Sequence, residues 1–220
     1  MRLTVDIVLF GYDLNQKDLK ILLIKRNYEP FIDEWALSGG FVSDTENLES
    51  AVSRIFKFET SIETDNIYLE QLYSFGEVNR DPRERIITIS YYGLSKTIET
   101  SSSSEKDAKW FSINEIPKLA FDHNDIVNIA LKRLRGKIVY QPIGFELLPD
   151  NFTMDELLNL YETILDKKLD KRNFSKKILK YDILEFIEKR NDSVGRPKHI
   201  YQFNKEKYNE LLNSGFYFEL

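Results

Sequence analysis

The segment Gly40–Ile62, GFVSDTENLESAVSRIFKFETSI, predicts a loop, an amphipathic helix and a second loop. From Leu48 to Glu59 the apolar residues recur at steps of three and four, which places them on one face of a helix. The stretch before it, WALSGGFV, is typical of a short strand that ends in a turn. We therefore expect Gly39 and Gly40 to serve a tight turn, where the backbone comes close to the helix or to a ligand.

Strand-like and helix-like stretches alternate on both sides of this segment. Runs rich in β-branched and aromatic residues predict strands at Thr4–Tyr12, Leu19–Lys25, Ile67–Phe75, Ile86–Leu94 and Ala108–Ser112. A further helix is expected over Asp122–Arg135, where Asp122 fits the role of N-cap, and Ser101–Asp107 is expected to be a flexible connection. Interleaved strands and helices are typical of a layered α/β domain, which we place at residues 1–140.

The pattern changes between residues 141 and 150, which we interpret as a linker because Pro142, Gly144 and Pro149 interrupt any helix there. Residues 151–220 then predict a helix that begins with a capping box, a basic helix and a β-hairpin. The expected ranges are Met154–Leu165, Lys171–Lys180, Leu184–Glu188 and His199–Phe203. This order is typical of a winged helix-turn-helix, in which the second helix of the pair enters the DNA major groove.

The charge of the chain is unevenly distributed. The 220 residues carry 31 Lys and Arg against 36 Asp and Glu, a net charge of −5. Residues 1–150 carry −6, whereas the segment 167–198 contains 11 basic and 5 acidic residues. A local basic excess attracts phosphates even on an acidic chain, so this segment favours nucleic-acid binding. A solvated lysine-rich surface is the alternative interpretation.

The composition excludes several classes of site. The chain has no cysteine, which excludes disulfides, thiol nucleophiles and cysteine-ligated metals. Two histidines, His123 and His199, are too few for a multi-histidine metal site. The apolar run at residues 5–10 is interrupted by Asp6 and is too short for a secretory signal or a membrane span. We therefore expect a cytoplasmic protein that does not contact a membrane.

The helical segment resembles the Nudix box, G-x5-E-x7-R-E-U-x-E-E-x-G-U, in which U is a bulky aliphatic residue. The positions that match are Gly40, Glu46, Arg54, Phe56, Glu59 and Ile62. Ile55 and Phe58 stand where the box has glutamates, and Ser61 stands where it has glycine. In the box, carboxylates three and four residues apart share one helix face and hold Mg²⁺ against a diphosphate.

These departures leave Glu59 as the only one of the three helix carboxylates. A single carboxylate makes a poor Mg²⁺ site, and hydrolysis of a diphosphate also requires a base or a second metal. We therefore expect a Nudix fold that has lost its catalysis and holds no metal or cofactor, with Arg54 paired to Glu59. The alternative is a hydrolase that uses displaced ligands such as Glu46, Glu49 and Glu84.

A degenerate Nudix domain followed by a winged helix resembles the layout of the Nudix-related transcriptional regulators of the NrtR family. Five strings resemble in particular the pentose-responsive Bacteroidetes branch: KRNYEPFIDEWALSGGFV, NRDPRERIITISYYGL, FDHNDIVNIAL, QPIGFELLP and LDKRNFSKKIL. The resemblance covers nearly the whole chain and implies a Nudix-type α/β/α sandwich with a C-terminal winged helix. It also implies a homodimeric repressor of double-stranded operator DNA, whose Nudix domain senses ADP-ribose or a pentose such as L-arabinose.

Polar loops flank the Nudix cleft in the resembling fold, and their mixed charges suit either effector. A diphosphate requires cations or a metal, whereas a pentose requires planar polar side chains and an aromatic face. The loss of the metal carboxylates and the likeness to the Bacteroidetes branch favour a pentose. The candidate ligand-binding residues are Arg26, Glu29, Trp35, Gly39, Gly40, Arg80, Asp81, Arg85 and His123. A purely structural role stays open for Trp35 and His123.

The expected basic helix supplies most of the candidate DNA contacts. Lys and Arg would mostly hold phosphates, while Arg172 is suited to guanine and Asn173 to adenine. The candidate DNA-binding residues are Lys171, Arg172, Asn173, Ser175, Lys176 and Lys177 on the helix, with Arg196 and Lys198 on the wing. The small core of this domain is expected to contain Leu160, Ile164, Phe174, Ile178, Leu184 and Phe186.

Three functions are compatible with the sequence. The first, which we favour, is a ligand-responsive DNA-binding repressor. The second is a Nudix hydrolase of ADP-ribose-like substrates with an accessory C-terminal domain. The third is a sugar- or nucleotide-binding scaffold whose winged domain binds a protein rather than DNA.

Overall fold

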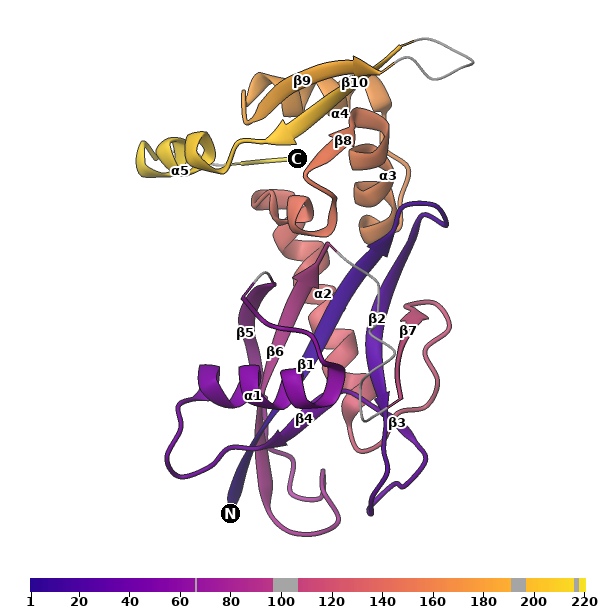
Figure 1. Ribbon diagram of the computed structural model, residues 1–220, viewed down its shortest axis with the longest axis vertical. Coiled ribbons are helices and arrows are strands. Elements are labelled where there is room, and N and C mark those ends of the chain that lie inside the picture. The colour runs from indigo at the N-terminus through magenta and orange to yellow at the C-terminus, as the bar shows by residue number, and fades with distance from the viewer. Residues whose placement is uncertain (66, 97–106, 191–196, 216–217) are drawn as a thin grey trace. The chain divides into compact units, whose positions relative to one another are not determined.

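The structure is a computed structural model that describes residues 1–65, 67–96, 107–190, 197–215 and 218–220. Within these residues the chain forms two compact units, whose elements are labelled in Figure 1. The first unit takes in Met1–Asp13 and Asp18–Arg133, and the second takes in Leu14–Lys17 and Leu134–Leu220. The domain bounds expected from the sequence, residues 1–140 and 151–220, stay a prediction.

The first unit is built on a seven-stranded sheet. Its strands are β1 (Arg2–Asp13), β2 (Asp18–Lys25), β3 (Trp35–Ala36), β4 (Ser38–Phe41), β5 (Tyr68–Phe75), β6 (Ile86–Ser95) and β7 (Ala108–Ser112). Its helices are α1 (Leu48–Thr60) and the part of α2 (His123–Tyr140) up to Arg133. The strand order is β3-β2-β1-β6-β5, with β4 paired to β1 and β7 paired to β2. Strand β1 is parallel to β6 and antiparallel to β2 and β4, so it lies at the centre of the sheet.

Alternation along β1 divides the interior of this unit into two layers. The odd-numbered residues from Val5 to Leu9 pack against α1 in one hydrophobic cluster. Thr4 and Asp6 point to the opposite face, where His123 at the start of α2 approaches Asp6. Figure 1 shows the two helices on opposite faces of the sheet. The α/β/α sandwich expected from the sequence is therefore confirmed.

Helix α1 coincides with the helix that the sequence predicts, and both of its ends have a local cause. Asn47 caps the start, because its side-chain Oδ1 accepts a hydrogen bond of 2.8 Å from the N–H of Ser50. Ser61 ends the helix in the left-handed conformation, with a φ of 60°. The loop–helix–loop of the segment Gly40–Ile62 is thus fixed by residues within the segment itself.

Gly39 and Gly40 lie within strand β4 rather than in a turn, so that part of the prediction is wrong. They pair with Asp6 and Val5 of β1. Gly39 is required by a close approach, because a Cβ there would lie 2.1 Å from Asp6 Oδ1 and 2.8 Å from the carbonyl oxygen of Val5. The absence of a side chain lets the backbone of β4 pass directly beside the Asp6 carboxylate.

The second unit contains the two helices and the hairpin that the sequence predicts. Its elements are η1 (Ile143–Leu147), β8 (Asn151–Thr153), α3 (Met154–Leu165), α4 (Lys171–Lys180), β9 (Leu184–Arg190), β10 (Lys198–Phe203) and α5 (Lys205–Asn213). Strand β10 lies between β8 and β9 in an antiparallel sheet. The capping box of α3 is present, because Thr153 and Glu156 each accept a hydrogen bond from the other's backbone N–H. The sequence patterns do not predict η1, β8 or α5.

The core of the second unit differs from expectation at one aromatic residue. The helical residues expected there are buried: Leu160, Ile164, Phe174 and Ile178. Phe186, by contrast, is 51% exposed, so its predicted place in the core is wrong. It lies on β9, an edge strand of the small sheet, and its ring contacts the rings of His199 and Tyr201 from the side.

Two predictions fall partly or wholly outside the described residues. The serine-rich connection Ser101–Asp107 is described only at Asp107, and the wing residue Arg196 is not described. No helix in the described part of the chain is long and apolar enough to cross a membrane.

Candidate functional site

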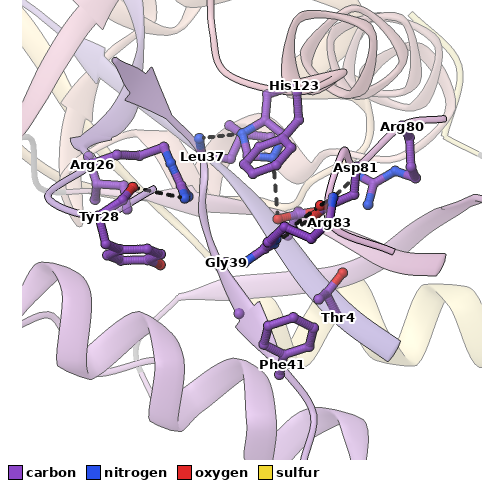
Figure 2. A pocket seen from close by; sticks show the side chains of 14 residues that line it. Thr4, Arg26, Tyr28, Leu37, Gly39, Phe41, Arg80, Asp81, Arg83 and His123 are labelled. Atoms are coloured by element: carbon purple, nitrogen blue, oxygen red, sulfur yellow. Dashed lines mark hydrogen bonds and ion pairs between the residues drawn. The ribbon is translucent and has the colours of Figure 1, made fainter. Parts of the chain in front are cut away.

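The first unit contains a pocket of about 130 Å³ on the face of β1 that carries Thr4 and Asp6. Strands β1 and β4, the loop after β2, the loop between β5 and β6, and the start of α2 contribute to it (Figure 2). The lining residues are Thr4, Asp6, Ile24, Arg26, Tyr28, Leu37, Gly39, Gly40, Phe41, Arg80, Asp81, Arg83, Phe121 and His123. Charged side chains of both signs therefore share a small cavity with apolar and aromatic residues.

Arg80 is the buried cation of this pocket, with its side chain only 4% exposed. Its Nε and Nη2 donate hydrogen bonds of 2.8 and 2.7 Å to the two carboxylate oxygens of Asp122. Nη2 also lies 3.4 Å from Asp6 Oδ2. Burial alone would lower the pKa of Arg80, but the two carboxylates outweigh it and raise the pKa, so the guanidinium stays charged. The Asp122 carboxylate, expected to act as an N-cap, instead joins α2 to the loop between β5 and β6.

His123 is buried in the wall of the pocket as a neutral imidazole. Its Nδ1 accepts a hydrogen bond of 3.0 Å from the N–H of Leu37, which leaves the ring proton on Nε2. Nε2 lies 3.6 Å from Asp6 Oδ1. Burial lowers the pKa of His123 and outweighs the opposing effect of the Asp6 and Asp122 carboxylates.

Burial of neutral His123 predicts a loss of stability in mild acid. The pKa of this group is about 6.5 in the unfolded chain and lower in the folded one, so the unfolded state binds more protons between those two values. The free energy of unfolding is therefore expected to fall as the pH drops below about 6.5. Urea titrations between pH 7.5 and pH 5 measure this, and His123→Gln is expected to flatten the dependence. An equal slope in the variant would show that other groups cause it.

Two further arginines alternate with aromatic rings along the pocket. The guanidinium of Arg26 lies 4.5 Å from the ring centre of Tyr28 and 4.8 Å from that of Phe121. The guanidinium of Arg83 lies 5.6 Å from Phe121 and 5.3 Å from Phe41. Figure 2 shows Arg26 and Tyr28 on one side of the pocket and Arg83 on the other. Planar cations and ring faces thus frame the cavity.

These two arginines differ in their partners. Arg83 donates to both carboxylate oxygens of Asp81, at 2.9 and 2.7 Å. Burial raises the pKa of Asp81, but the hydrogen bonds from Arg83 outweigh burial and lower it. Arg26 donates instead to the carbonyl oxygens of Pro30, at 2.8 Å, and Tyr28, at 3.4 Å. None of the described carboxylates pairs with Arg26, so it keeps an uncompensated charge.

The structure places six of the nine candidate ligand-binding residues in the lining: Arg26, Gly39, Gly40, Arg80, Asp81 and His123. Glu29 and Arg85 are exposed and lie outside it, and Trp35 packs edge-on against Phe111 with ring centres 4.8 Å apart. Among the residues that sequence reasoning missed are Thr4, Asp6, Phe41 and Phe121. The available signal was in β1, where Thr4 and Asp6 are polar residues in an otherwise apolar strand.

The Nudix-box positions make a structural network around α1. Arg54 donates to both oxygens of Glu46, with Nε–Oε2 at 2.9 Å, and this pairing lowers the pKa of Glu46 to about 2. Glu59 is buried and accepts a hydrogen bond of 2.9 Å from the N–H of Gly39. The predicted Arg54–Glu59 pair is therefore wrong. Five residues along a helix correspond to a rotation of about 140°, which turns the two side chains to different sides.

The residues of α1 do not fit a magnesium ion. Ile55 is 5% exposed and packs into the hydrophobic cluster, while Phe58 is 59% exposed and carries no oxygen. The Glu59 carboxylate already binds a backbone N–H. In the described part of the chain, no group of three or more His, Cys, Asp or Glu side chains is placed to hold a metal ion. Mg²⁺ requires several oxygen ligands in octahedral geometry, which this helix does not offer.

The second unit presents a basic surface on α4. Asp170 caps the helix by accepting a hydrogen bond of 2.7 Å from the N–H of Asn173. Four exposed residues share the side away from Phe174 and Ile178: Arg172, Asn173, Lys176 and Lys180. Lys180 was missed from the sequence, although it follows Lys176 at helical spacing. These residues form the outward face of α4.

Three further candidate DNA-binding residues border a groove of about 420 Å³ between α3, α4 and β10. Lys171, Ser175 and Lys198 line it, and Lys171 forms an ion pair of 2.6 Å with Asp155 at the start of α3. Lys177 is half-buried on the other flank of α4. The described candidate DNA-binding residues therefore divide into an outward set on α4, a set that lines this groove, and Lys177 on the other flank.

Comparisons with known proteins agree with this architecture. Residues 2–129 match the NUDIX domain family, and residues 144–203 match the NrtR DNA-binding winged helix domain. The ADPR responsive transcriptional repressor NtrR of Acinetobacter baylyi is 34% identical over 94% of this chain and 83% of its own length. The crystal structure of Shewanella oneidensis NrtR complexed with a 27mer DNA superposes on this chain with a TM-score of 0.81. Its sequence is 32% identical, and the match covers 98% of this chain and 97% of the NrtR chain.

A shorter relative is an enzyme rather than a regulator. The ADP-ribose pyrophosphatase of Methanocaldococcus jannaschii is 42% identical over 55% of this chain and 71% of its own length. The likeness to the A. baylyi and S. oneidensis regulators, in contrast, extends over both units of the chain. The chain therefore belongs to the NrtR family of transcriptional regulators, in which a Nudix domain is joined to a DNA-binding winged helix.

Proposed function

We propose that this protein is an effector-controlled repressor that binds operator DNA through α4 and releases it when a pentose ring occupies the Nudix pocket. The observation that carries the proposal is the size and charge balance of that pocket. Its 130 Å³ is well below the roughly 300–1,000 Å³ of pockets that enclose drug-sized ligands. A free pentose such as L-arabinose is small enough to be enclosed.

The polar groups of the pocket also suit a neutral sugar. Arg80 is neutralised by Asp122 and Asp6, and Arg83 is neutralised by Asp81. Such pairs offer fixed donors and acceptors to hydroxyl groups without a large net charge. The flanking rings of Phe41 and Phe121 supply the apolar faces against which a sugar ring packs.

ADP-ribose is the second candidate, and a separate observation favours it. Arg26 has no carboxylate partner among the described residues, and a diphosphate is an anion that a guanidinium binds well. The A. baylyi relative is an ADPR responsive repressor. In this case the terminal ribose would occupy the pocket while the diphosphate lies against Arg26 and the adenosine extends outside.

The effector and the DNA are tested together. Duplexes that bind the purified protein are selected from a random library, and one is labelled for fluorescence anisotropy. The fraction bound is expected to fall on addition of L-arabinose, and binding itself is expected to weaken steeply with salt. Release by ADP-ribose alone would identify the second candidate. The absence of any selected duplex, even at low salt, would overturn the repressor.

The proposal includes a homodimer that presents two copies of α4 to a palindromic operator in the cytoplasm. Selected duplexes should then contain inverted half-sites about one helical turn apart, centre to centre. Selected sequences without such symmetry would count against the dimer while leaving DNA binding intact.

We also propose that the Nudix domain binds without hydrolysis. Ile55 and Phe58 leave α1 without the oxygen ligands that a diphosphate-cleaving metal site requires. With ADP-ribose and Mg²⁺ or Mn²⁺, AMP release is expected to stay at the rate of the buffer control. Release at an enzymatic rate, lost in Glu59→Gln, would instead make the protein a hydrolase like the M. jannaschii relative.

A further inference from the structure

Two polar residues on β1 form the floor of the pocket, and neither belongs to the Nudix box. Thr4 and Asp6 are two residues apart on one strand, so their side chains point to the same face and lie about 7 Å apart along it. Their neighbours Val5 and Ile7 point the other way into the hydrophobic cluster beneath α1. Both Thr4 and Asp6 line the cavity, and both are more than nine-tenths buried.

The Thr4 hydroxyl is buried without a hydrogen-bond partner among the described residues. Thr4 is 7% exposed, and only its carbonyl oxygen is engaged, by the hydroxyl of Thr88 at 3.2 Å. An unpaired buried hydroxyl costs about 1–3 kcal/mol, so such groups are rare unless a ligand satisfies them. The position of Thr4 in the lining makes the cavity the direction from which a partner would come (Figure 2).

The Asp6 carboxylate has only long contacts with its two donors among the described side chains. Arg80 Nη2 lies 3.4 Å from Asp6 Oδ2, and His123 Nε2 lies 3.6 Å from Asp6 Oδ1. Both distances exceed the roughly 2.7–3.2 Å of a good hydrogen bond. The short hydrogen bonds of Arg80 go to Asp122 instead. The Asp6 oxygens can therefore accept short hydrogen bonds from a ligand.

We propose that Thr4 and Asp6 together hold neighbouring hydroxyl groups of the effector, so that the pocket recognises a vicinal diol. Asp6 accepts the hydroxyl protons, since a carboxylate has acceptor sites only, and the Thr4 hydroxyl either donates or accepts. The inference rests on the proposed effector site and narrows its chemistry to an uncharged polyol end. A phosphate at this position would be repelled by Asp6, and a deoxy sugar would leave a buried polar group unpaired.

The test uses isosteric variants of the full-length protein and isothermal titration with L-arabinose, D-ribose, 2-deoxy-D-ribose and ADP-ribose. Thr4→Val keeps the shape and removes the hydroxyl. It is expected to weaken binding of the best ligand up to about 10-fold, while the unfolding midpoint stays equal or rises because an unpaired group is gone. Asp6→Asn is expected to weaken binding about 10- to 100-fold, since hydrogen bonds to a charged group are the stronger ones.

Ser38 provides the matched control. Its hydroxyl is also buried and unpaired among the described residues, but Ser38 lies outside the lining, between Leu37 and Gly39. Ser38→Ala should therefore leave the affinity unchanged and should not lower the unfolding midpoint. If Asp6→Asn fails to fold, Thr4→Val and the deoxy sugar carry the test, because neither disturbs the Arg80 ion pairs.

The outcomes separate the inference from the proposed function. Weaker binding in Thr4→Val but not in Ser38→Ala, with 2-deoxy-D-ribose at least 10-fold weaker than D-ribose, supports the diol site. Unchanged affinity in both Thr4→Val and Asp6→Asn, with a ligand that binds the wild type, overturns the diol site and leaves the repressor intact. If the wild type binds none of the four compounds, the proposed effector class and the diol site fail together.

Discussion

Replacement of Arg80 by methionine is expected to lower the free energy of unfolding by about 3–5 kcal/mol, the cost of removing one partner from a buried ion pair. Arg80 is 4% exposed, and its loss would leave the Asp122 and Asp6 carboxylates without their cation. Guanidinium titrations of wild type and Arg80→Met measure the difference.

Arg54→Met is the matched control. Arg54 and Glu46 form the same two-pronged arginine–carboxylate contact on the surface, where the Arg54 side chain is 53% exposed. Solvent screens such pairs, so this variant is expected to unfold close to the wild type. If Arg80→Met and Arg54→Met lower the free energy of unfolding equally, burial does not set the strength of the Arg80 pair. If Arg80→Met folds with the stability of the wild type, the buried ion pair does not stabilise the pocket.

The second large effect is expected from the basic face of α4. Lys176→Gln together with Lys180→Gln removes two exposed charges and keeps good helix formers at both positions. Each phosphate contact contributes about 0.9 to the slope of log affinity against log salt, so the slope should fall by about 1.8 for each copy of α4 that contacts the DNA. At about 50 mM salt this corresponds to an affinity roughly 200-fold lower for each copy, with the difference vanishing towards 1 M salt. Anisotropy titrations at four or more salt concentrations measure both.

Lysines of the same unit that lie off this face supply the control. Lys205 and Lys207 on α5 pair with Glu146 and Asp182. Lys205→Gln with Lys207→Gln carries the same change in net charge and is expected to leave the slope unchanged. A similar loss of DNA affinity in both double variants would indicate that binding depends on overall charge. Unchanged DNA affinity in the α4 variant would exclude that face as the phosphate contact.

The sequence predicts those features whose causes are local. The period of α1 and the capping box at Thr153 both act within a few residues, and each is present in the structure. The order of helices and hairpin in the second unit follows from the same short-range patterns. Predictions of this kind require no knowledge of how distant segments meet.

The pocket depends on contacts that no local pattern contains. Arg80 meets Asp122 across 42 positions of the chain and Asp6 across 74. The position of Arg80 in a charge-dense segment predicts a surface loop, whereas the ion pairs bury it. The turn predicted at Gly39 fails for a similar reason. The steric requirement for glycine there comes from Asp6, which lies on another strand. The sequence therefore predicts the loops that border the pocket but not Thr4 and Asp6, the residues of β1 at its floor.

The burial of Ile55 has an evolutionary consequence. Its side chain packs into the cluster beneath α1 and lies 3.3 Å from where a Cβ on Gly40 would stand. A glutamate introduced there alone would place an unpaired charge in an apolar surrounding before any metal was present to compensate it. A return to the glutamate of the Nudix box at position 55 is therefore expected to lower the stability of the first unit unless neighbouring residues change with it.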